Sequence, residues 1–573
     1  MIKHKFYISL FFLISLNPFL TLLIEDYSHF YIFDSITVET VNFYLTKSYS
    51  FLNNFSFFYI EKFTDYRIFN QHDIVPNLIH SLFILIFNEK STIFLQVFLF
   101  FITLVLMFYF NIKFFKFNED VSGTLAIVLF IFHTIGPESA KTFFNYFLIT
   151  KDYQFNFFRY NFPLINTFLF LIYLIIFFKD YKQKEISKKL IFITIINGFS
   201  YFYTAIFAVL NNFLYISFII LRKNFFITNY KKIFFFFLIN FFITINFIYL
   251  KNLHSSFISH NLSIKLFFSL QHILTNFSFE FYRDNLVSLT IIAISFLLYF
   301  YSKKNIFIKI IYFHLLLNFL TLVELFGIEM GGFHFDQYIL RPLNIISVTF
   351  IIFSLLKKKI NFLLKFISLI LVFIFCISNY NFFKKINFLQ KNNLNFQKKV
   401  ITDLKKFNKV FEIEQLLQKE KKGGRGVIEV FITSPYASSI FTSLNHKNKI
   451  YVSNGTTMRS NELSIKDNNE NFISFCKFFY FNYKDCYSLM FDYSENGKLS
   501  SFADQIWGTN FPSQHEFMNL YLRESSSLKF NTQLFIVNKS NKYYDLFTSK
   551  LRNHNYKLIE GDELILFVPN EKL

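Results

Sequence analysis

The chain has 573 residues, of which 53% are hydrophobic and 22% aromatic, and its formal net charge is +20. A soluble protein of this length usually carries more charge and has shorter apolar segments. Here the apolar residues form long runs, and Lys and Arg gather in the short segments between them. Basic residues in short loops set the orientation of a membrane protein, and this explains the positive charge better than binding to nucleic acid does. We therefore exclude nucleic acid as a partner.

The first apolar run, Phe6–Ile24, follows a basic start and is followed by the acidic pair Glu25-Asp26. A signal peptide would be followed by a cleavage site made of small residues, and none is present there. We therefore expect an uncleaved first helix whose N-terminus is in the cytoplasm.

Nine further apolar runs follow. They are Thr92–Ile112, Val121–Gly136, Phe162–Phe178, Leu190–Leu221, Ile233–Leu250, Leu286–Tyr301, Ile306–Leu325, Leu343–Leu356 and Ile360–Ser378. Most can cross about 30 Å of hydrocarbon at 1.5 Å per residue. The sequence therefore predicts an α-helical polytopic membrane protein with about 10 or 11 spans, placed in the cytoplasmic (inner) membrane.

Two segments need a special reading. Leu190–Leu221 is too long for one span and lies between two basic clusters, so we expect a hairpin of two helices that turns near Ser200–Thr204. Val75–Phe87 is short and contains Pro76 and His80, which favours an interfacial or re-entrant helix on the outer side, with a true span as the alternative.

We place the basic clusters in the cytoplasm, and each crossing then moves the chain to the other side of the membrane, which assigns every remaining segment to one side. The transmembrane domain covers residues 1–380, with outer loops at 25–74, 137–161, 251–285 and 326–342. Residues 381–426 read as a charged helical linker, and residues 427–573 as an extracytoplasmic α/β domain with strands at Val427–Thr433, Lys449–Val452, Gln533–Val537 and Leu564–Val568. Helices are expected at Asn471–Tyr483 and Tyr543–His554. A bridge between Cys476 and Cys486 stays open, since it requires the first of these helices to end before Cys486.

Most of the unusual polar residues fall in the outer segments. Glu25 and Asp26 could act as a general base or ligate a divalent cation, or could merely mark where a helix leaves the membrane. Arg159 and Arg341 each precede a span that starts near a proline, where a guanidinium could hold phosphate oxygens or only anchor headgroups. His334 and Asp336 could complete the site beside Arg341.

The layout resembles the GT-C class of membrane glycosyltransferases. Glu25-Asp26 match the acidic motif that follows the first helix in that class, and the segments Phe158–Pro163 and His334–Pro342 look like pieces of related envelope proteins. The resemblance implies transfer of a sugar from a polyprenyl-phosphate donor to an envelope acceptor on the extracytoplasmic face. It implies that Asp26 is the base supported by Glu25, and that Arg159 and Arg341 stabilise the leaving phosphate. The partners would be membrane lipid and the lipid-linked sugar. The resemblance leaves open whether a divalent cation is a cofactor.

Two other classes remain. A transporter or a lipid or glycan flippase would place ionisable groups near the membrane midplane, where His133 and His314 are the nearest examples. A non-catalytic scaffold with an outer interaction domain predicts no clustering of the outer acids and arginines.

Overall fold

The computed structural model of the chain is mostly helical, and a small sheet lies near its C-terminus. It describes residues 4–24, 48, 51–52, 58–60, 67–69, 74–131, 165–200, 202–221, 223–253, 279–322, 339–356, 361–420, 428–432, 450–452, 473, 476–477, 479, 481–491, 494–495, 498–499, 513–523, 534–541 and 543–570.

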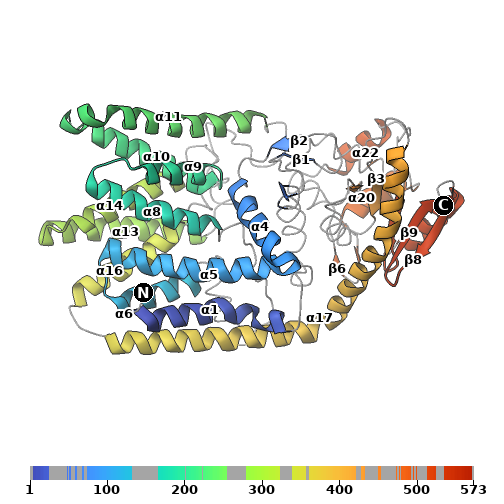
Figure 1. Cartoon of the computed structure of the whole chain (residues 1–573), viewed down its shortest axis with the longest axis horizontal. Helices are drawn as coiled ribbons and strands as arrows, with labels where there is room; N and C mark the ends of the chain where they lie inside the picture. The colour runs from blue at the N-terminus through green and yellow to red at the C-terminus, as the bar shows by residue number, and fades with distance from the viewer. Residues whose placement is uncertain are drawn as a thin grey trace.

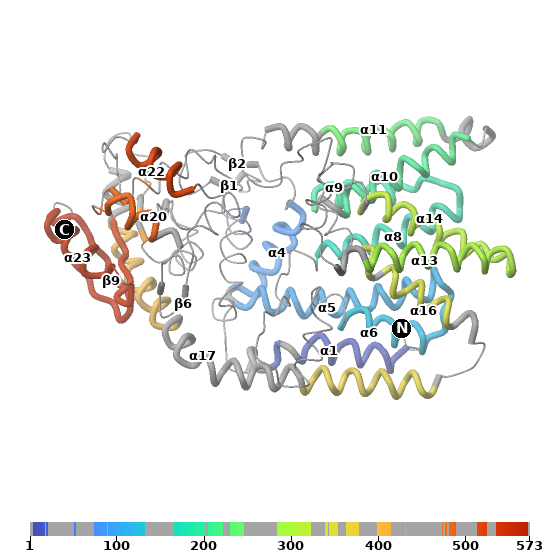
Figure 2. The backbone as a smooth tube through the Cα atoms, turned by 180° about the vertical axis from the view of Figure 1, so that it is seen from behind, coloured from blue at the N-terminus to red at the C-terminus, as the bar shows by residue number. Residues whose placement is uncertain are grey.

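Most of the described helices lie side by side along the long axis of the molecule, and the sheet lies at one end (Figures 1 and 2). We call this set of helices the helical bundle. Its members are α1 (Lys5–Ile24), α5 (Ser91–Phe110), α6 (Glu119–Leu129), α8 (Asn166–Gln183), α9 (Lys188–Gly198), α10 (Phe202–Ile220), α11 (Lys223–Leu253), α13 (Phe279–Ser302), α14 (Asn305–Leu322), α16 (Arg341–Leu356) and the first part of α17 (Asn361–Glu420). Each predicted apolar run therefore contains a helix.

Two of the described helices, Ser91–Phe115 and Arg283–Ser302, are long and apolar enough to cross a bilayer. Six shorter apolar helices have 10–17 residues. Length and composition alone thus support fewer crossings than the roughly ten expected from the sequence.

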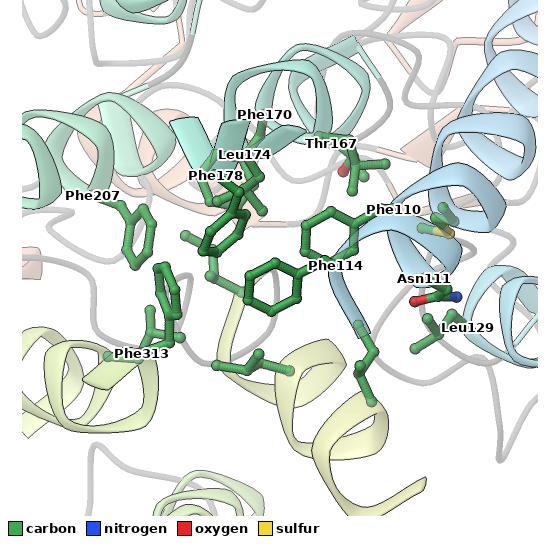
Figure 3. Close-up of a pocket in the computed structure, with 16 residues that line it drawn as sticks. Phe110, Asn111, Phe114, Leu129, Thr167, Phe170, Leu174, Phe178, Phe207 and Phe313 are labelled. Carbon is green, nitrogen blue, oxygen red and sulfur yellow. The ribbon is translucent and has the colours of Figure 1, made fainter. Parts of the chain in front are cut away.

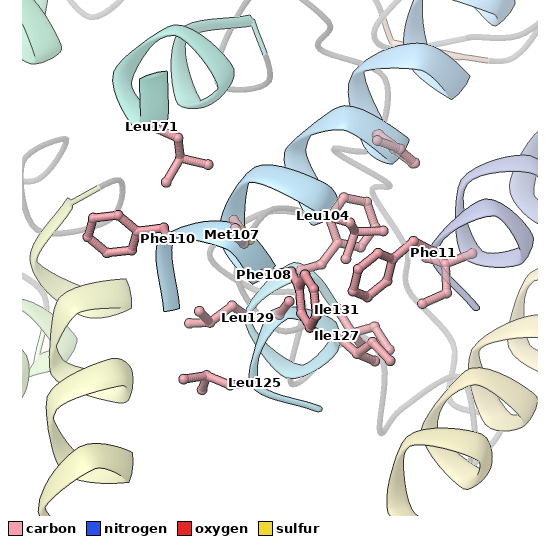
Figure 4. Close-up of a cluster of buried hydrophobic side chains, with 14 of the residues drawn as sticks. Phe11, Leu104, Met107, Phe108, Phe110, Leu125, Ile127, Leu129, Ile131 and Leu171 are labelled. Atoms are coloured by element: carbon pink, nitrogen blue, oxygen red, sulfur yellow. The ribbon is translucent and has the colours of Figure 1, made fainter. Parts of the chain in front are cut away.

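Interlocking aromatic and aliphatic side chains join α1, α5 and α6 (Figure 4). Phe11 of α1, Phe108 of α5 and Ile127 of α6 all belong to this cluster. A close approach of α1 to α6 depends on Gly123, because a β-carbon there would lie 2.1 Å from the Tyr7 ring. Removing such contacts by truncation typically costs about 2–5 kcal/mol per large side chain.

A second part of the bundle is joined by uncharged polar side chains. Tyr173 of α8 donates to Asn212 of α10 over 2.9 Å, and Asn211 donates to the Tyr173 hydroxyl over 2.9 Å. Asn212 in turn donates to Thr194 of α9 and Asn240 of α11. Buried amides and hydroxyls that satisfy one another in this way hold helices together without any help from water.

The predicted hairpin is confirmed, because α9 ends at Gly198 and α10 begins at Phe202. Ser187 caps the N-terminus of α9 by accepting from the backbone N–H of Leu190. The α9–α10 turn meets the separate helix α4 (Ile74–Phe87), since Val75 donates to the Phe199 carbonyl over 3.2 Å. Helix α4 crosses the space between the bundle and the sheet, obliquely to the other helices (Figure 1).

Helix α17 differs from expectation, because the last apolar run and the charged linker form one helix of 60 residues. It runs from the bundle into the C-terminal part of the molecule (Figures 1 and 2). The sequence between the two segments contains neither Pro nor Gly, so nothing in the chain breaks the helix.

The C-terminal sheet has the strand order β4-β3-β7-β9-β8. Its strands are β3 (Ile428–Ile432), β4 (Ile450–Val452), β7 (Leu534–Asn538), β8 (Tyr556–Glu560) and β9 (Leu564–Pro569). Strand β3 pairs in parallel with β4 and β7, whereas β9 pairs antiparallel with β7 and β8. All four predicted strands match observed strands within one residue at either end, namely β3, β4, β7 and β9. Strand β8 was not predicted.

Both faces of this sheet are covered. Leu534 and Ile536 pack with Leu404 of α17, while Phe535 and Val537 pack with Phe547 of α23 (Tyr544–Asn553) on the other face. This alternation follows from the two-residue period of a strand. Helices α20 (Tyr483–Phe491) and α22 (Gln514–Arg523) contribute to the second face through Cys486 and Phe517.

A disulfide joins Cys476 to Cys486, with their α-carbons 5.7 Å apart. Such a distance requires the chain to turn between them, and α20 indeed begins only at Tyr483. The helix predicted over Asn471–Tyr483 is therefore wrong in its C-terminal part. Two small ladders, β1 (Phe58–Ile60) with β2 (Arg67–Phe69) and β5 (Ser494–Glu495) with β6 (Lys498–Leu499), were also not predicted.

Candidate functional site

Arg341 is the first residue of α16 and one of the residues predicted to hold phosphate. Its Nε atom lies 2.6 Å from Oδ2 of Asp284, and the Asp284 side chain is 8% exposed. Asp284 belongs to α13, which begins at Phe279 and so extends into the segment expected to be the outer loop 251–285. The last residues of that predicted loop, from Phe279 on, are therefore helical.

A second arginine reaches the same carboxylate. Arg283 places its Nε atom 3.1 Å from Oδ1 of Asp284, and its side chain is 48% exposed. Asn344, one turn along α16, donates to the Asp284 backbone carbonyl over 2.9 Å. Two guanidinium groups thus contact one carboxylate near the N-terminus of α16, where the helix dipole favours an anion.

Polar side chains continue from this point into the bundle. Thr321 of α14 donates to Asn285 over 2.6 Å, and Asn318 donates to Ser288. His314 lies next, bonded to Ser288 over 2.7 Å and to Ser347 of α16 over 2.9 Å. From Arg341 to Ser347 the chain advances about 9 Å along α16 at 1.5 Å per residue, so the polar groups reach well inside the bundle.

An apolar pocket lies on a different side of the same helices (Figure 3). Leu343 and Ile346 of α16 line it together with Phe313 of α14. Two residues along a helix correspond to a rotation of about 200°, so Arg341 and Leu343 leave α16 in nearly opposite directions. The pocket and the arginine site are therefore neighbours on α16 without sharing its face.

The remaining predicted site residues lie outside the described residues. They are Glu25, Asp26, Arg159, His334 and Asp336. Whether they meet Arg341 in one cavity stays a prediction. Within the part of the chain that the structure describes, no three His, Cys, Asp or Glu side chains gather as metal ligands.

Sequence reasoning missed Asp284, Arg283 and Asn344. The signal was present, because Arg283-Asp284 is an adjacent pair of opposite charges directly before the apolar run that starts at Leu286. The pair falls within the predicted outer loop 251–285, although the structure places it inside α13.

Comparison with known proteins gives no assignment for this site: no family model matches the chain, and no curated protein matches it. The chemistry of the site therefore has to be argued from the residues alone.

Proposed function

We propose that the chain is a polytopic membrane protein of the cytoplasmic membrane. Its bundle exposes large apolar side chains such as Phe242 (61%), Leu297 (69%) and Phe373 (66%), while Asn212 and His314 are buried. Hydrocarbon as the surrounding solvent accounts for both observations, since it accepts exposed Phe and Leu and disfavours exposed amides. Tilted helices and the flanking residues of the shorter apolar helices supply the length that a span needs.

In this proposal the N-terminus is cytoplasmic and the C-terminal domain is extracytoplasmic. The basic segments between helices favour the cytoplasmic side. The Cys476–Cys486 bridge supports an oxidising compartment for the domain, because disulfides are rare in the cytosol. Arg341 and Asp284 then belong to the outer ends of α16 and α13.

The proposed activity is transfer of a sugar from a polyprenyl-phosphate donor to an envelope acceptor. The observation that carries it is the convergence of Arg341 and Arg283 on Asp284 at the outer end of the bundle. Asp284 engages the Nε atom of Arg341 and so fixes the plane of the guanidinium. A fixed guanidinium at the lipid–water boundary is suited to the phosphate of a membrane-bound donor.

The proposed reaction needs a base and a group that stabilises the departing phosphate. Asp26, supported by Glu25, would take the proton from the acceptor hydroxyl as its oxygen attacks the sugar. The bond between the sugar and the phosphate oxygen then breaks, and the negative charge stays on the polyprenyl phosphate. Arg341, with Arg159, would stabilise that charge, while His334 and Asp336 would help to hold the donor.

The test is the amount of surface glycan in cells that carry single substitutions. Asp26→Asn keeps the size of the side chain and removes the base, so it should abolish transfer. Arg341→Lys keeps the charge but loses the fork of donors, so transfer should fall on the order of 100-fold. Arg283→Lys is the matched control, because it changes the more exposed of the two arginines on Asp284.

Normal glycan in the Asp26→Asn strain, with the protein present at its usual level, would contradict this mechanism and favour the non-catalytic scaffold. Equal losses from Arg341→Lys and Arg283→Lys would contradict the assignment of Arg341 to the phosphate. Accumulation of lipid-linked sugar in the Asp26→Asn strain is the result expected if transfer alone is blocked.

A transporter or flippase is the second candidate, and the polar chain through Ser288, His314 and Ser347 favours it. An intramembrane histidine in a transporter would take part in the transport cycle. His314→Gln should then block export of a glycan or lipid while leaving sugar transfer intact. A glycosyltransferase predicts normal transfer and normal export in that variant.

A further inference from the structure

The apolar pocket of the bundle contains one feature that packing alone does not explain. Six phenylalanines line it, from α5, the π-helical turn after it, α8, α10 and α14. They are Phe110, Phe114, Phe170, Phe178, Phe207 and Phe313. Among them stands Asn111, whose side chain is drawn beside Phe110 and Leu129 in Figure 3.

Asn111 is fully buried, and neither its Nδ2 nor its Oδ1 atom has a hydrogen-bond partner among the described residues. An unsatisfied buried polar group costs about 1–3 kcal/mol, so a leucine of similar size would be the more stable choice here. Asn111 also begins the π-helical turn Asn111–Phe115, an irregular geometry that often occurs at functional sites. Both observations indicate a ligand that completes the hydrogen bonds of this amide.

The surroundings of Asn111 restrict the chemistry of that ligand. Apart from Asn111 and Thr167, every side chain that lines the pocket is apolar, and none is charged. A charged group would lose its hydration there without gaining a counter-charge. A side-chain amide both donates and accepts hydrogen bonds, and a hydroxyl group can accept from its nitrogen or donate to its oxygen. The rest of the ligand must be apolar to match the phenylalanines.

We infer that this pocket binds a neutral long-chain lipid whose hydroxyl group bonds with Asn111. The inference rests on the membrane placement proposed above and is independent of sugar transfer. The lipid is distinct from the polyprenyl-phosphate donor, because the arginines and the pocket lie on different sides of α16 and no cation lines the pocket.

The test uses the full chain in lipid nanodiscs and photoactivatable probes. A long-chain alcohol, the corresponding alkane and the corresponding carboxylate carry the same photoreactive group. We expect the alcohol to label peptides that contain Phe110 and Phe170 more strongly than the alkane or the carboxylate does. In Asn111→Leu the labelling by the alcohol should fall on the order of tenfold, to the level of the alkane.

Thr103→Val is the matched control. Thr103 lies on the same helix, is fully buried and has an Oγ1 atom without a partner among the described residues, but it does not line the pocket. Labelling of Thr103→Val should equal that of the unaltered chain. Because labelling needs no sugar donor, its outcome is separate from that of the glycan test.

Two results with the unaltered chain and Asn111→Leu would overturn the inference. One is equal labelling of the unaltered chain by alcohol and alkane; the other is undiminished labelling of Asn111→Leu by the alcohol. A second variant, Leu174→Trp, guards against a folding defect in Asn111→Leu, because it fills the pocket and leaves Asn111 in place. Loss of labelling in Leu174→Trp supports the pocket as the site, and unchanged labelling places the alcohol elsewhere.

Discussion

The helical bundle and the C-terminal domain use the same residue types in opposite ways. In the bundle, Leu297 and Phe373 are exposed while Asn212 and His314 are buried. In the domain, Phe535 and Phe567 are buried within the sheet, whereas the charged residues Lys557 and Glu560 are exposed. The difference supports the proposal that the two regions have different surroundings, hydrocarbon around the bundle and water around the domain.

The largest expected effect concerns the two sides of the membrane. A reporter enzyme that works only outside the cytoplasm should be active when fused after Leu573 and inactive when fused after Lys189. The expected difference is all or none, because the proposed topology places the two fusion points on opposite sides of the membrane. Activity at Lys189 would reverse the orientation and place Arg341 and Asp284 in the cytoplasm.

The next largest effect concerns the junction between the two regions. Asp403 of α17 accepts three backbone N–H groups from the turn between β8 and β9: Oδ1 bonds with Asp562 over 2.7 Å, and Oδ2 with Glu563 and Leu564 over 2.8 and 2.9 Å. Lys399 lies beside this turn, where the Glu563 carboxylate raises the lysine pKa. Asp403→Ala leaves three donors without their acceptor, so the domain should lose about 3 kcal/mol of stability.

Denaturant unfolding followed by the fluorescence of Trp507, the single tryptophan of the chain, measures this loss. Thr402→Ala is the control on the same helix, because its exposed hydroxyl bonds only to the Lys398 carbonyl one turn back. Its effect should stay within about 0.5 kcal/mol. Equal effects of the two substitutions would show that Asp403 does not hold the domain to α17.

The smallest effect depends on pH and tests the proposed aqueous surroundings of the domain. Ser513 and Glu516 form a capping box at the start of α22: the Ser513 N–H and hydroxyl both donate to Oε2 of Glu516 over 2.8 Å. These bonds lower the pKa of Glu516 below its usual 4.5. A carboxyl group with a lowered pKa in the folded state stabilises the domain above its unfolded pKa.

This contribution should be complete at neutral pH and should disappear as the pH falls from 4.5 through the lowered value. Glu516→Gln should therefore be slightly less stable than the unaltered chain at pH 7, and the difference should shrink below pH 4 as the glutamate itself becomes protonated. Unfolding measured across this range provides the check, and a difference that is constant with pH would contradict the role of the ionised carboxylate.

Much of the fold follows from local features of the sequence. Every predicted apolar run contains a helix, because a helix satisfies its backbone hydrogen bonds within one segment, even where the run includes Pro18 in α1 or Gly123 in α6. The turn of the α9–α10 hairpin was also predictable, since basic clusters on both sides of Leu190–Leu221 require an even number of crossings. The core strands β7 and β9 stood out as compact apolar runs.

Other features depend on contacts between distant segments. Strand β8 has no fully buried residue and no regular alternation of half-buried and exposed residues, so only its pairing with β9 identifies it. The bond of Asp284 with Arg341 joins residues 57 positions apart. Nothing in the sequence near Arg341 points to Asp284 as its partner, so the arginine was predicted as a site residue and the carboxylate was missed. Asn111 likewise looked like an ordinary residue at the end of an apolar run.

The continuity of α17 constrains how the gene for this chain can change in length. Each residue added to an α-helix advances it by 1.5 Å and turns everything beyond it by about 100°. A single inserted codon between the bundle and Asp403 would therefore swing the whole domain around the helix axis. An insertion of seven residues makes nearly two full turns, so it would restore the direction in which the domain faces and move the domain farther from the bundle along the helix axis. Seven-residue steps are thus the natural unit by which relatives of this chain should differ in this segment.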